Sequence, residues 1–387
     1  MKKIRVLLAG IGGYGDIYIN ELLHNPDPAI EIAGIADPFA ERSPWYGEIK
    51  ARNIPLFKSP EVFYQNHKTP GADLAVIASP IHTHYGYIAT ALNNGSNVLC
   101  EKPVCADLRQ IDTLIAKERE TGLFVAIGYQ LCFARHVLAL KEDILQGIFG
   151  RPRRFKAMCL PRRGTRYYRR NGWAGKRQFE GEPILDSPLN NACAHEVMNM
   201  LFLLGRNQVS AADVRSVQAE LWRARPDIEN YDAAAVRIRT EGDTELLFFT
   251  AHCIEEKQIG PLGEYVFERG IIRRGENSKD DFTAYFYDGQ IKTYRPAPEE
   301  KRLQKLYDAL ESIRSGSPPV CTLETARPHL QCVLMAQEFP IQVMPEEKLV
   351  LGGKDTEDPY YYVPGLAQSF SRCYEEYRLP SEGGVLF

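Results

Sequence analysis

The sequence predicts an α/β protein with two domains. The first is a Rossmann domain with a doubly wound parallel sheet, and the second is an α+β domain with a large open, mostly antiparallel sheet. Two observations support this fold class. From residue 4 to residue 128, short β-rich runs alternate with amphipathic stretches, as they do in strand–helix–strand units. Beyond residue 150, long segments of alternating polarity follow one another with few helices between them.

The spacing of apolar residues places the individual elements. In the first domain, strands are expected at residues 4–9, 30–35, 74–78, 97–100 and 123–127, and helices at 17–23, 85–92 and 108–117. In the second, a helix at 136–145 precedes strands at 153–159, 234–239, 245–251 and 264–271, and helices return at 303–313 and 324–335. Because 387 residues exceed what one core normally supports, we divide the chain into domains at 1–128 and 129–387.

The overall composition is that of a soluble globular protein, with 44% hydrophobic and 25% charged residues. No apolar run approaches the ~20 residues that a membrane-spanning helix needs. The run after Met1 breaks at Gly10 without a cleavage-site pattern, which favours a first strand over a signal peptide. The nine cysteines are scattered and never form C-x-x-C, so neither a metal site nor a disulfide framework is expected. These features predict a cytoplasmic protein without a membrane partner.

A glycine-rich segment lies between the first expected strand and the first expected helix, which is the context that a dinucleotide-binding loop requires. It consists of Gly10, Gly12, Gly13, Tyr14 and Gly15 with Ile11 between them. Such a loop lets the backbone approach a pyrophosphate at a helix N-terminus. Asp37 follows the second strand, where a carboxylate accepts hydrogen bonds from the adenosine ribose and repels a 2′-phosphate. NAD is therefore the expected cofactor, with NADP left open because Arg42 is close by.

Two further motifs follow the next strands, at the carboxyl edge of the sheet where ligands bind. Ser79, Pro80, His82 and His84 come from the first, and Glu101-Lys102-Pro103 is the second. Together with the glycine loop, these motifs resemble the glucose-fructose oxidoreductase and inositol dehydrogenase (Gfo/Idh/MocA) family of NAD(P)-dependent oxidoreductases. The resemblance extends through residues 128–130 to a late Pro-Pro segment at 318–322. It implies that the cofactor is contacted by the glycine loop and Asp37 and by Ser79, Pro80, His82, His84, Glu101 and Lys102. It also implies that Lys102 contacts the substrate and that Pro103 follows a cis bond.

The family usually continues with D-x-x-x-H on a helix, and here the sequence departs from its pattern. Asn191 replaces the aspartate, whereas His195, the base that the resemblance implies, is retained. One helix would place the two side chains a turn apart on a shared face. Met198 stands where many relatives have another acid. Asp186, in the preceding loop, is a candidate to supply the missing charge.

A basic and aromatic insert precedes these residues. Residues 151–177 contain eleven Lys or Arg and no acid, so the formal net charge of −3 leaves −14 on the rest of the chain. Aromatic faces stack on sugar rings, and guanidinium groups bind carboxylate or phosphate. The candidate substrate contacts are Arg163, Arg166, Tyr167, Tyr168 and Trp173, joined by Asp186 and Asn191. A solvated or subunit-contact loop remains the alternative, and the acidic remainder argues against a nucleic-acid groove.

The expected function is reversible hydride transfer between NAD(P) and a secondary alcohol of a sugar, cyclitol or anionic sugar derivative. His195 would remove the hydroxyl proton, Lys102 would polarise the oxygen and Asn191 would orient it. Two alternatives stay open. One is glycosidic cleavage through transient oxidation, and the other is a non-catalytic regulator that binds dinucleotide and a protein partner. A homo-oligomer, dimer or tetramer, is expected, because an open sheet leaves one face unpaired.

Overall fold

The computed structural model describes residues 3–25, 27–276 and 278–384. Within it the chain forms two compact units. The first comprises Met1–Phe133 and Lys301–Ala326, and the second comprises Ala134–Glu300 and Arg327–Phe387. The first unit therefore takes in a late segment that the predicted boundary at residue 128 assigned to the second domain.

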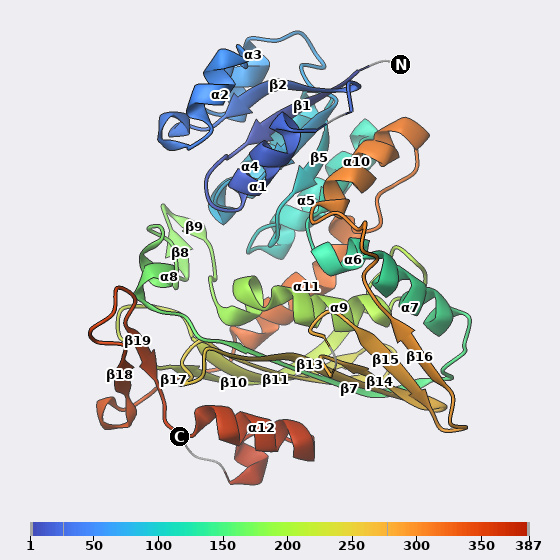
Figure 1. Cartoon of the computed structure of the whole chain (residues 1–387), viewed down its shortest axis with the longest axis vertical. Coiled ribbons are helices and arrows are strands. Elements are labelled where there is room, and N and C mark those ends of the chain that lie inside the picture. Colours follow the sequence, from blue (N-terminus) through green and yellow to red (C-terminus); the bar gives the residue numbers. More distant parts are fainter. Residues whose placement is uncertain (1–2, 26, 277, 385–387) are drawn as a thin grey trace. The chain divides into compact units, whose positions relative to one another are not determined.

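A six-stranded parallel sheet forms the centre of the first unit (Figure 1). Its strands, in spatial order, are β3 (Leu56–Phe57), β2 (Ile30–Ala36), β1 (Ile4–Ala9), β4 (Leu74–Ile77), β5 (Asn97–Cys100) and β6 (Val125–Ile127). The helices are α1 (Gly15–Leu23), α2 (Tyr46–Ala51), α3 (Pro60–Gln65), α4 (Ile81–Asn93), α5 (Leu108–Thr121), α6 (Gln130–Phe133) and α10 (Gln304–Ser315), with a 3₁₀ turn η1 (Ala40–Arg42). This order of parallel strands is that of a doubly wound Rossmann sheet, so the predicted fold is confirmed.

Helix α10 joins the first unit because its inner face is apolar and it carries a buried cation. Leu306, Ala309 and Leu310 are almost fully buried. Lys305, 1% exposed, pairs with Glu101 at the end of β5. An apolar face and a single lysine do not indicate, from the sequence, which of the two sheets this helix covers.

A nine-stranded mixed sheet forms the second unit. Its strands, in spatial order, are β16 (Ile291–Tyr294), β15 (Phe282–Phe286), β14 (Gly270–Arg274), β13 (Gln258–Phe267), β7 (Pro152–Pro161), β12 (Glu245–Ala251), β11 (Ala233–Thr240), β10 (Val214–Arg223) and β17 (Ile341–Val343). Only β7–β12 and β10–β17 are parallel pairs among the described strands of this sheet, so a mostly antiparallel sheet is confirmed. Two small hairpins accompany it, β8 (Gln178–Phe179) with β9 (Glu182–Pro183), and β18 (Val350–Gly352) with β19 (Tyr360–Tyr362).

The single strand predicted at 264–271 is wrong, because the segment turns between β13 and β14. The backbone N–H groups of Glu268 and Arg269 donate to the carbonyls of Arg151 and Phe149, both at 3.0 Å. These contacts come from a distant segment and hold the turn without the Gly or Asn that usually marks a hairpin.

Helices lie on both faces of the second sheet (Figure 1). They are α7 (Arg135–Leu145), α8 (Thr165–Arg169), α9 (Ala194–Leu203), α11 (Leu323–Ala336) and α12 (Leu366–Glu376), with short turns η2 (Pro188–Ala192), η3 (Glu346–Lys348) and η4 (Ser381–Gly383). Leu366, Phe370 and Cys373 of α12 pack in one cluster with Leu247 and Phe249 of β12. The tail helix thus covers part of the face that was expected to be unpaired, and the homo-oligomer stays a prediction. No helix in the described part of the chain is long and apolar enough to cross a membrane.

Candidate functional site

The glycine loop of the first unit is tightly packed on one side and open on the other. A Cβ atom on Gly10, whose φ is +87°, would lie 2.8 Å from the backbone nitrogen of Ser79. A Cβ on Gly12 would meet nothing within 4 Å. Gly10 is thus required for the close approach of two strand ends, whereas the backbone at Gly12 faces open space. This arrangement fits a dinucleotide pyrophosphate at the start of α1, which begins at Gly15.

Asp37 is fixed beside this loop. Its carboxylate accepts a hydrogen bond from Ile11 N at 2.9 Å and another from Phe39 N at 2.7 Å. Each oxygen keeps further acceptor capacity, so the carboxylate can also receive ribose hydroxyls. The exposed Arg42 has its guanidinium carbon 4.6 Å from the centroid of the Phe39 ring. The glycine loop and Asp37 therefore come together as predicted.

His84 links the other two motifs of the first unit. Its Nε2 lies 2.9 Å from Ser79 O and its Nδ1 lies 2.8 Å from Pro103 O. Burial lowers the pKa of this imidazole. The Lys102–Pro103 bond is cis, as the family resemblance implied. His84 thus connects the turn after β4 to the Lys102–Pro103 segment. Pro80 is exposed, and His82 is half-buried at the start of α4.

Glu101 points into the interior of the first unit. Its carboxylate accepts from the Tyr18 hydroxyl at 2.8 Å and pairs with the Lys305 ammonium, which also donates to Gly128 O at 3.2 Å. The Tyr14 ring of the glycine loop lies over the same ammonium, with 4.6 Å between Nζ and the ring centroid. Through Lys305, Glu101 thus supports the Tyr14 ring of the glycine loop. A direct contact between Glu101 and the cofactor stays a prediction.

In the second unit, the insert gathers around the ring of Tyr167 in α8. The guanidinium carbons of Arg170 and Arg163 lie 3.7 Å and 4.9 Å from its centroid, and the His252 ring centroid lies 5.3 Å away. Arg170 also lies 5.0 Å from the Trp173 ring. His252 was not among the predicted site residues, because a single histidine directly after β12 carries no motif.

Several donors in this cluster point to no acceptor among the described residues: Arg163 Nε, Trp173 Nε1 and the buried His252 Nε2. The Tyr168 hydroxyl lies 2.8 Å from His252 Nδ1. Burial raises the pKa of Tyr168 well above its ordinary value, so the phenol is neutral and donates to Nδ1. Burial, together with Arg163 and Arg170, lowers the pKa of His252, which leaves the neutral tautomer with its proton on Nε2. The cluster therefore offers donors and positive charge to an oxygen-rich group.

Arg166 lies apart from this cluster. Its guanidinium pairs with Glu357, and its backbone N–H donates to Asp358 Oδ1 at 2.7 Å. Thr165 N also donates to Pro359 O at 2.8 Å. The segment between β18 and β19 thus caps α8. This contact was not predictable from local pattern, because the two partners are 192 residues apart in the chain.

Asp186 and Asn191 are directly bonded. Asn191 Nδ2 donates to Asp186 Oδ1 at 2.7 Å, and Asp186 Oδ2 accepts from Gly175 N at 2.6 Å. Arg170 Nη2 lies 3.8 Å from the same carboxylate. The compensating acid that the sequence suggested is therefore next to the substituted position.

The prediction that Asn191 and His195 share one helix is wrong. Asn191 lies in the π-helical turn η2, where Cys193 N donates to Pro188 O at 2.8 Å across five residues. A separate helix, α9, begins at Ala194, so His195 stands half-buried in its first turn. Met198 of the same helix is fully buried, which explains why an apolar side chain is accommodated there.

Comparison with known proteins supports the assignment drawn from the motifs. Residues 4–129 match the family model described as an oxidoreductase family with an NAD-binding Rossmann fold. This match lies within the first unit and agrees with the Gfo/Idh/MocA resemblance of the motifs. It is 27% identical to the scyllo-inositol 2-dehydrogenase (NAD(+)) of Bacillus subtilis (strain 168) over 154 residues, which are 40% of this chain and 44% of that protein. It is 28% identical to a putative UDP-kanosamine synthase oxidoreductase subunit of Amycolatopsis mediterranei (strain S699) over 247 residues, or 62% and 64% of the two chains.

A solved dehydrogenase structure has the same fold over a longer span. The crystal structure of the WlbA dehydrogenase from Bordetella pertussis, in complex with NADH and UDP-GlcNAcA, aligns with a TM-score of 0.71 and 20% identity. The alignment covers 87% of this chain and 97% of that one. By sequence, however, this chain spans 44% and 64% of the two relatives named above. The family model identifies residues 4–129 as an NAD-binding Rossmann fold.

Proposed function

We propose that this protein is an NAD-dependent dehydrogenase that oxidises a secondary alcohol of an anionic sugar or cyclitol, and reduces the ketone in reverse. The hydrogen bond between Asn191 and Asp186 is the observation that carries the proposal. It supplies a carboxylate beside the position where the family usually has its own. The loss of the customary acid therefore does not by itself favour a non-catalytic regulator.

Each group of the chain has a role in the proposed reaction. NAD, when bound, accepts the hydride. His195 takes the proton of the substrate hydroxyl, and Lys102 stabilises the negative charge that develops on its oxygen. Asn191 orients the hydroxyl through its amide oxygen, because its Nδ2 is committed to Asp186. Asp186 acts through Asn191 and is a positioning residue.

The substrate class follows from the cluster around Tyr167. Arg163 and Arg170 provide two cations there, and the unpartnered donors of Trp173 and His252 require acceptors. A carboxylate or phosphate on a sugar satisfies both needs, while the aromatic rings pack on the sugar carbons. A structural neighbour solved with UDP-GlcNAcA agrees with an anionic sugar, and a relative named for inositol agrees with a polyhydroxylated ring.

A thermal-shift panel with NAD present tests the substrate class. D-Glucuronate, D-galacturonate and glucose 6-phosphate should raise the melting temperature more than glucose or myo-inositol. Arg163→Gln and Arg170→Gln should reduce that difference. Arg166→Gln is the matched control, because Arg166 pairs with Glu357, and it should retain the preference for anions. An equal rise in melting temperature with neutral and anionic sugars would favour the alternative, in which the insert is a solvated loop.

Turnover of a stabilising sugar tests the reaction. His195→Asn and Lys102→Met should each lower kcat by at least ~10²-fold, the low end for a positioned acid or base, with NAD affinity unchanged. Asn191→Asp should abolish the bond to Asp186 by placing two carboxylates together, and should raise the pH needed for turnover. Wild-type turnover by His195→Asn would exclude His195 as the base. Glycoside cleavage without net NADH formation, or NAD-dependent binding of a protein without turnover, would establish one of the alternatives.

A further inference from the structure

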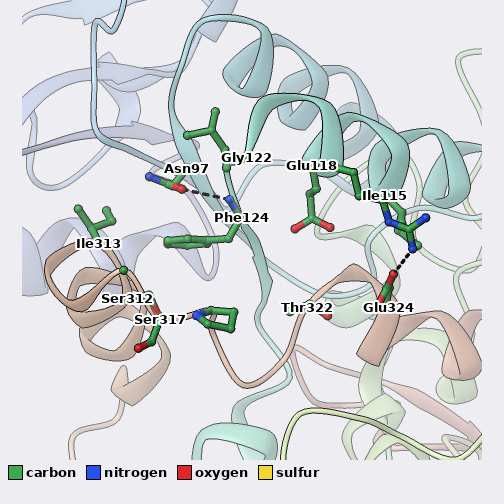
Figure 2. A pocket seen from close by; sticks show the side chains of 14 residues that line it. Asn97, Ile115, Glu118, Gly122, Phe124, Ser312, Ile313, Ser317, Thr322 and Glu324 are labelled. Carbon is green, nitrogen blue, oxygen red and sulfur yellow. Dashed lines mark hydrogen bonds and ion pairs between the residues drawn. The ribbon is translucent and has the colours of Figure 1, made fainter.

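A cavity lies in the first unit at the edge of the sheet opposite the glycine loop (Figure 2). The loop follows the carboxyl end of β1, whereas Asn97 begins β5 and Val125 begins β6. In a parallel sheet these starting residues mark the amino edge. The cavity, of about 520 Å³, falls within the size range of small-molecule sites. It is therefore separate from the dinucleotide site.

The walls combine a carboxyl group and an aromatic face. Figure 2 shows the Glu118 carboxylate turned toward the space between Phe124 and Glu324. One oxygen of Glu118 accepts from Val125 N at 2.6 Å. The half-buried Phe124 ring lines the cavity with Ile313 and Pro318.

Glu118 has no ion-pair partner among the described residues. The adjacent Arg119 is committed to Glu324 at 2.5 Å on the rim of the cavity. A carboxyl held by a single backbone donor in a concave, partly apolar site is an arrangement typical of a binding position. Among the described residues, no group of three His, Cys, Asp or Glu side chains could hold a metal ion. We therefore consider an organic cation as the ligand of Glu118.

We propose that this cavity binds a small organic ammonium ion, with Glu118 as its counter-charge and Phe124 as the ring face on which the ligand packs. Ammonium groups bind to carboxylates through charge-assisted hydrogen bonds, and cations are attracted to aromatic faces. The hydroxyls of Ser312 and Ser317 line the same space and can accept further N–H bonds.

Binding should be coupled to proton release. The pKa of Glu118 is raised to about 7, mainly by burial and also by the nearby Glu324, while the hydrogen bond from Val125 N and the charge of Arg119 act in the opposite direction. An ammonium ligand requires the ionised carboxylate, so its affinity should rise about tenfold from pH 6 to pH 8, as the ionised fraction of the carboxyl increases.

Calorimetric titration of the NAD-bound protein with benzylammonium chloride, at constant ionic strength and at pH 6, 7 and 8, tests the proposal. Benzyl alcohol is the neutral probe of the same shape. Benzylammonium should bind at least ~10-fold more tightly than benzyl alcohol at pH 8. At pH 6, where most of the carboxyl is protonated, its binding should release protons. Equal binding of the two probes, or benzylammonium affinity that does not change with pH, would overturn it.

Three variants locate the site. Glu118→Gln keeps an acceptor for Val125 N, and should weaken benzylammonium about tenfold and remove the pH dependence. Glu120→Gln removes an exposed carboxylate of the same helix and should have no effect. Phe124→Leu keeps an apolar side chain without a ring face, and should weaken the cation more than the alcohol. If both Glu118→Gln and Phe124→Leu bind benzylammonium as tightly as the wild type, this cavity is not its binding site. If Glu118→Gln does not fold, the benzylammonium affinity of Phe124→Leu decides.

Discussion

Replacing Lys305 with Met tests whether the buried pair with Glu101 holds α10 against the first sheet. Lys305 is 1% exposed and Glu101 is 9% exposed, so neither charge can be solvated if the other is removed. Met fills a similar volume, which leaves loss of the cation as the main effect. The Tyr18 hydroxyl remains bonded to the carboxylate, but it carries no charge.

The expected loss is large for a single substitution. Removing one member of a buried ion pair costs about 3–5 kcal/mol, because the remaining charge is left uncompensated. Glu101→Gln should also be destabilising, since it leaves the ammonium buried. The double variant removes both charges, so its cost should fall short of the sum of the two single costs by about 1–3 kcal/mol.

Hydrogen exchange of β1 and β5 amides, combined with urea unfolding, measures this effect within the first unit. Exchange is the decisive measurement, because a chain of two units need not unfold in one step. Lys117→Met is the control, since Lys117 donates to Asn93 at an exposed position of the same unit and should cost under about 0.5 kcal/mol. A loss below about 1 kcal/mol for Lys305→Met, or strict additivity in the double variant, would refute the argument.

Three further changes have defined outcomes. Asp37→Ser should narrow or reverse the preference for NAD over NADP, measured by cofactor fluorescence titration, and equal wild-type affinities would contradict the role of Asp37. Asp358→Ala should cost about 0.5–2 kcal/mol locally by uncapping α8, seen as faster exchange of its amides, whereas unchanged exchange would show that Thr165 and Pro359 suffice. Because the folded-state pKa of Glu118 is raised from 4.5 to about 7, its contribution to stability should be lost as pH rises through that interval. Glu118→Gln should remove this part of the slope in denaturant unfolding, and an unchanged slope would contradict the burial of the carboxyl.

The first sheet was predictable because its strands are buried on both faces and its helices are amphipathic. The predicted strands at 4–9 and 97–100 coincide with β1 and β5. The glycine loop and Asp37 were also found, since a pyrophosphate site needs small residues at a strand–helix turn and a carboxylate at the next strand end. These features depend on residues close together in the chain.

The second unit was less predictable, because its site is made by side chains from separate segments. His252 joins the Tyr167 cluster from β12, and Glu357 removes Arg166 from it, although neither position carries a local signal. The break between η2 and α9 was missed because it depends on a backbone bond from Cys193 to Pro188. The spacing of apolar residues does not predict such a backbone bond.

Local patterns were thus sufficient for the fold class, for the resemblance to the oxidoreductase family whose model matches residues 4–129, and for the dinucleotide loop. Strand and helix periodicity and turn chemistry act over short stretches of chain. Contacts between distant segments decided the rest. They assign α10 to the first unit through Lys305 and Glu101, and bring His252 to the ring of Tyr167. They also form the cavity that contains Glu118. The physical reason is that hydrogen bonds, ion pairs and packing depend on separation in space, which the order of residues leaves open until the chain is folded.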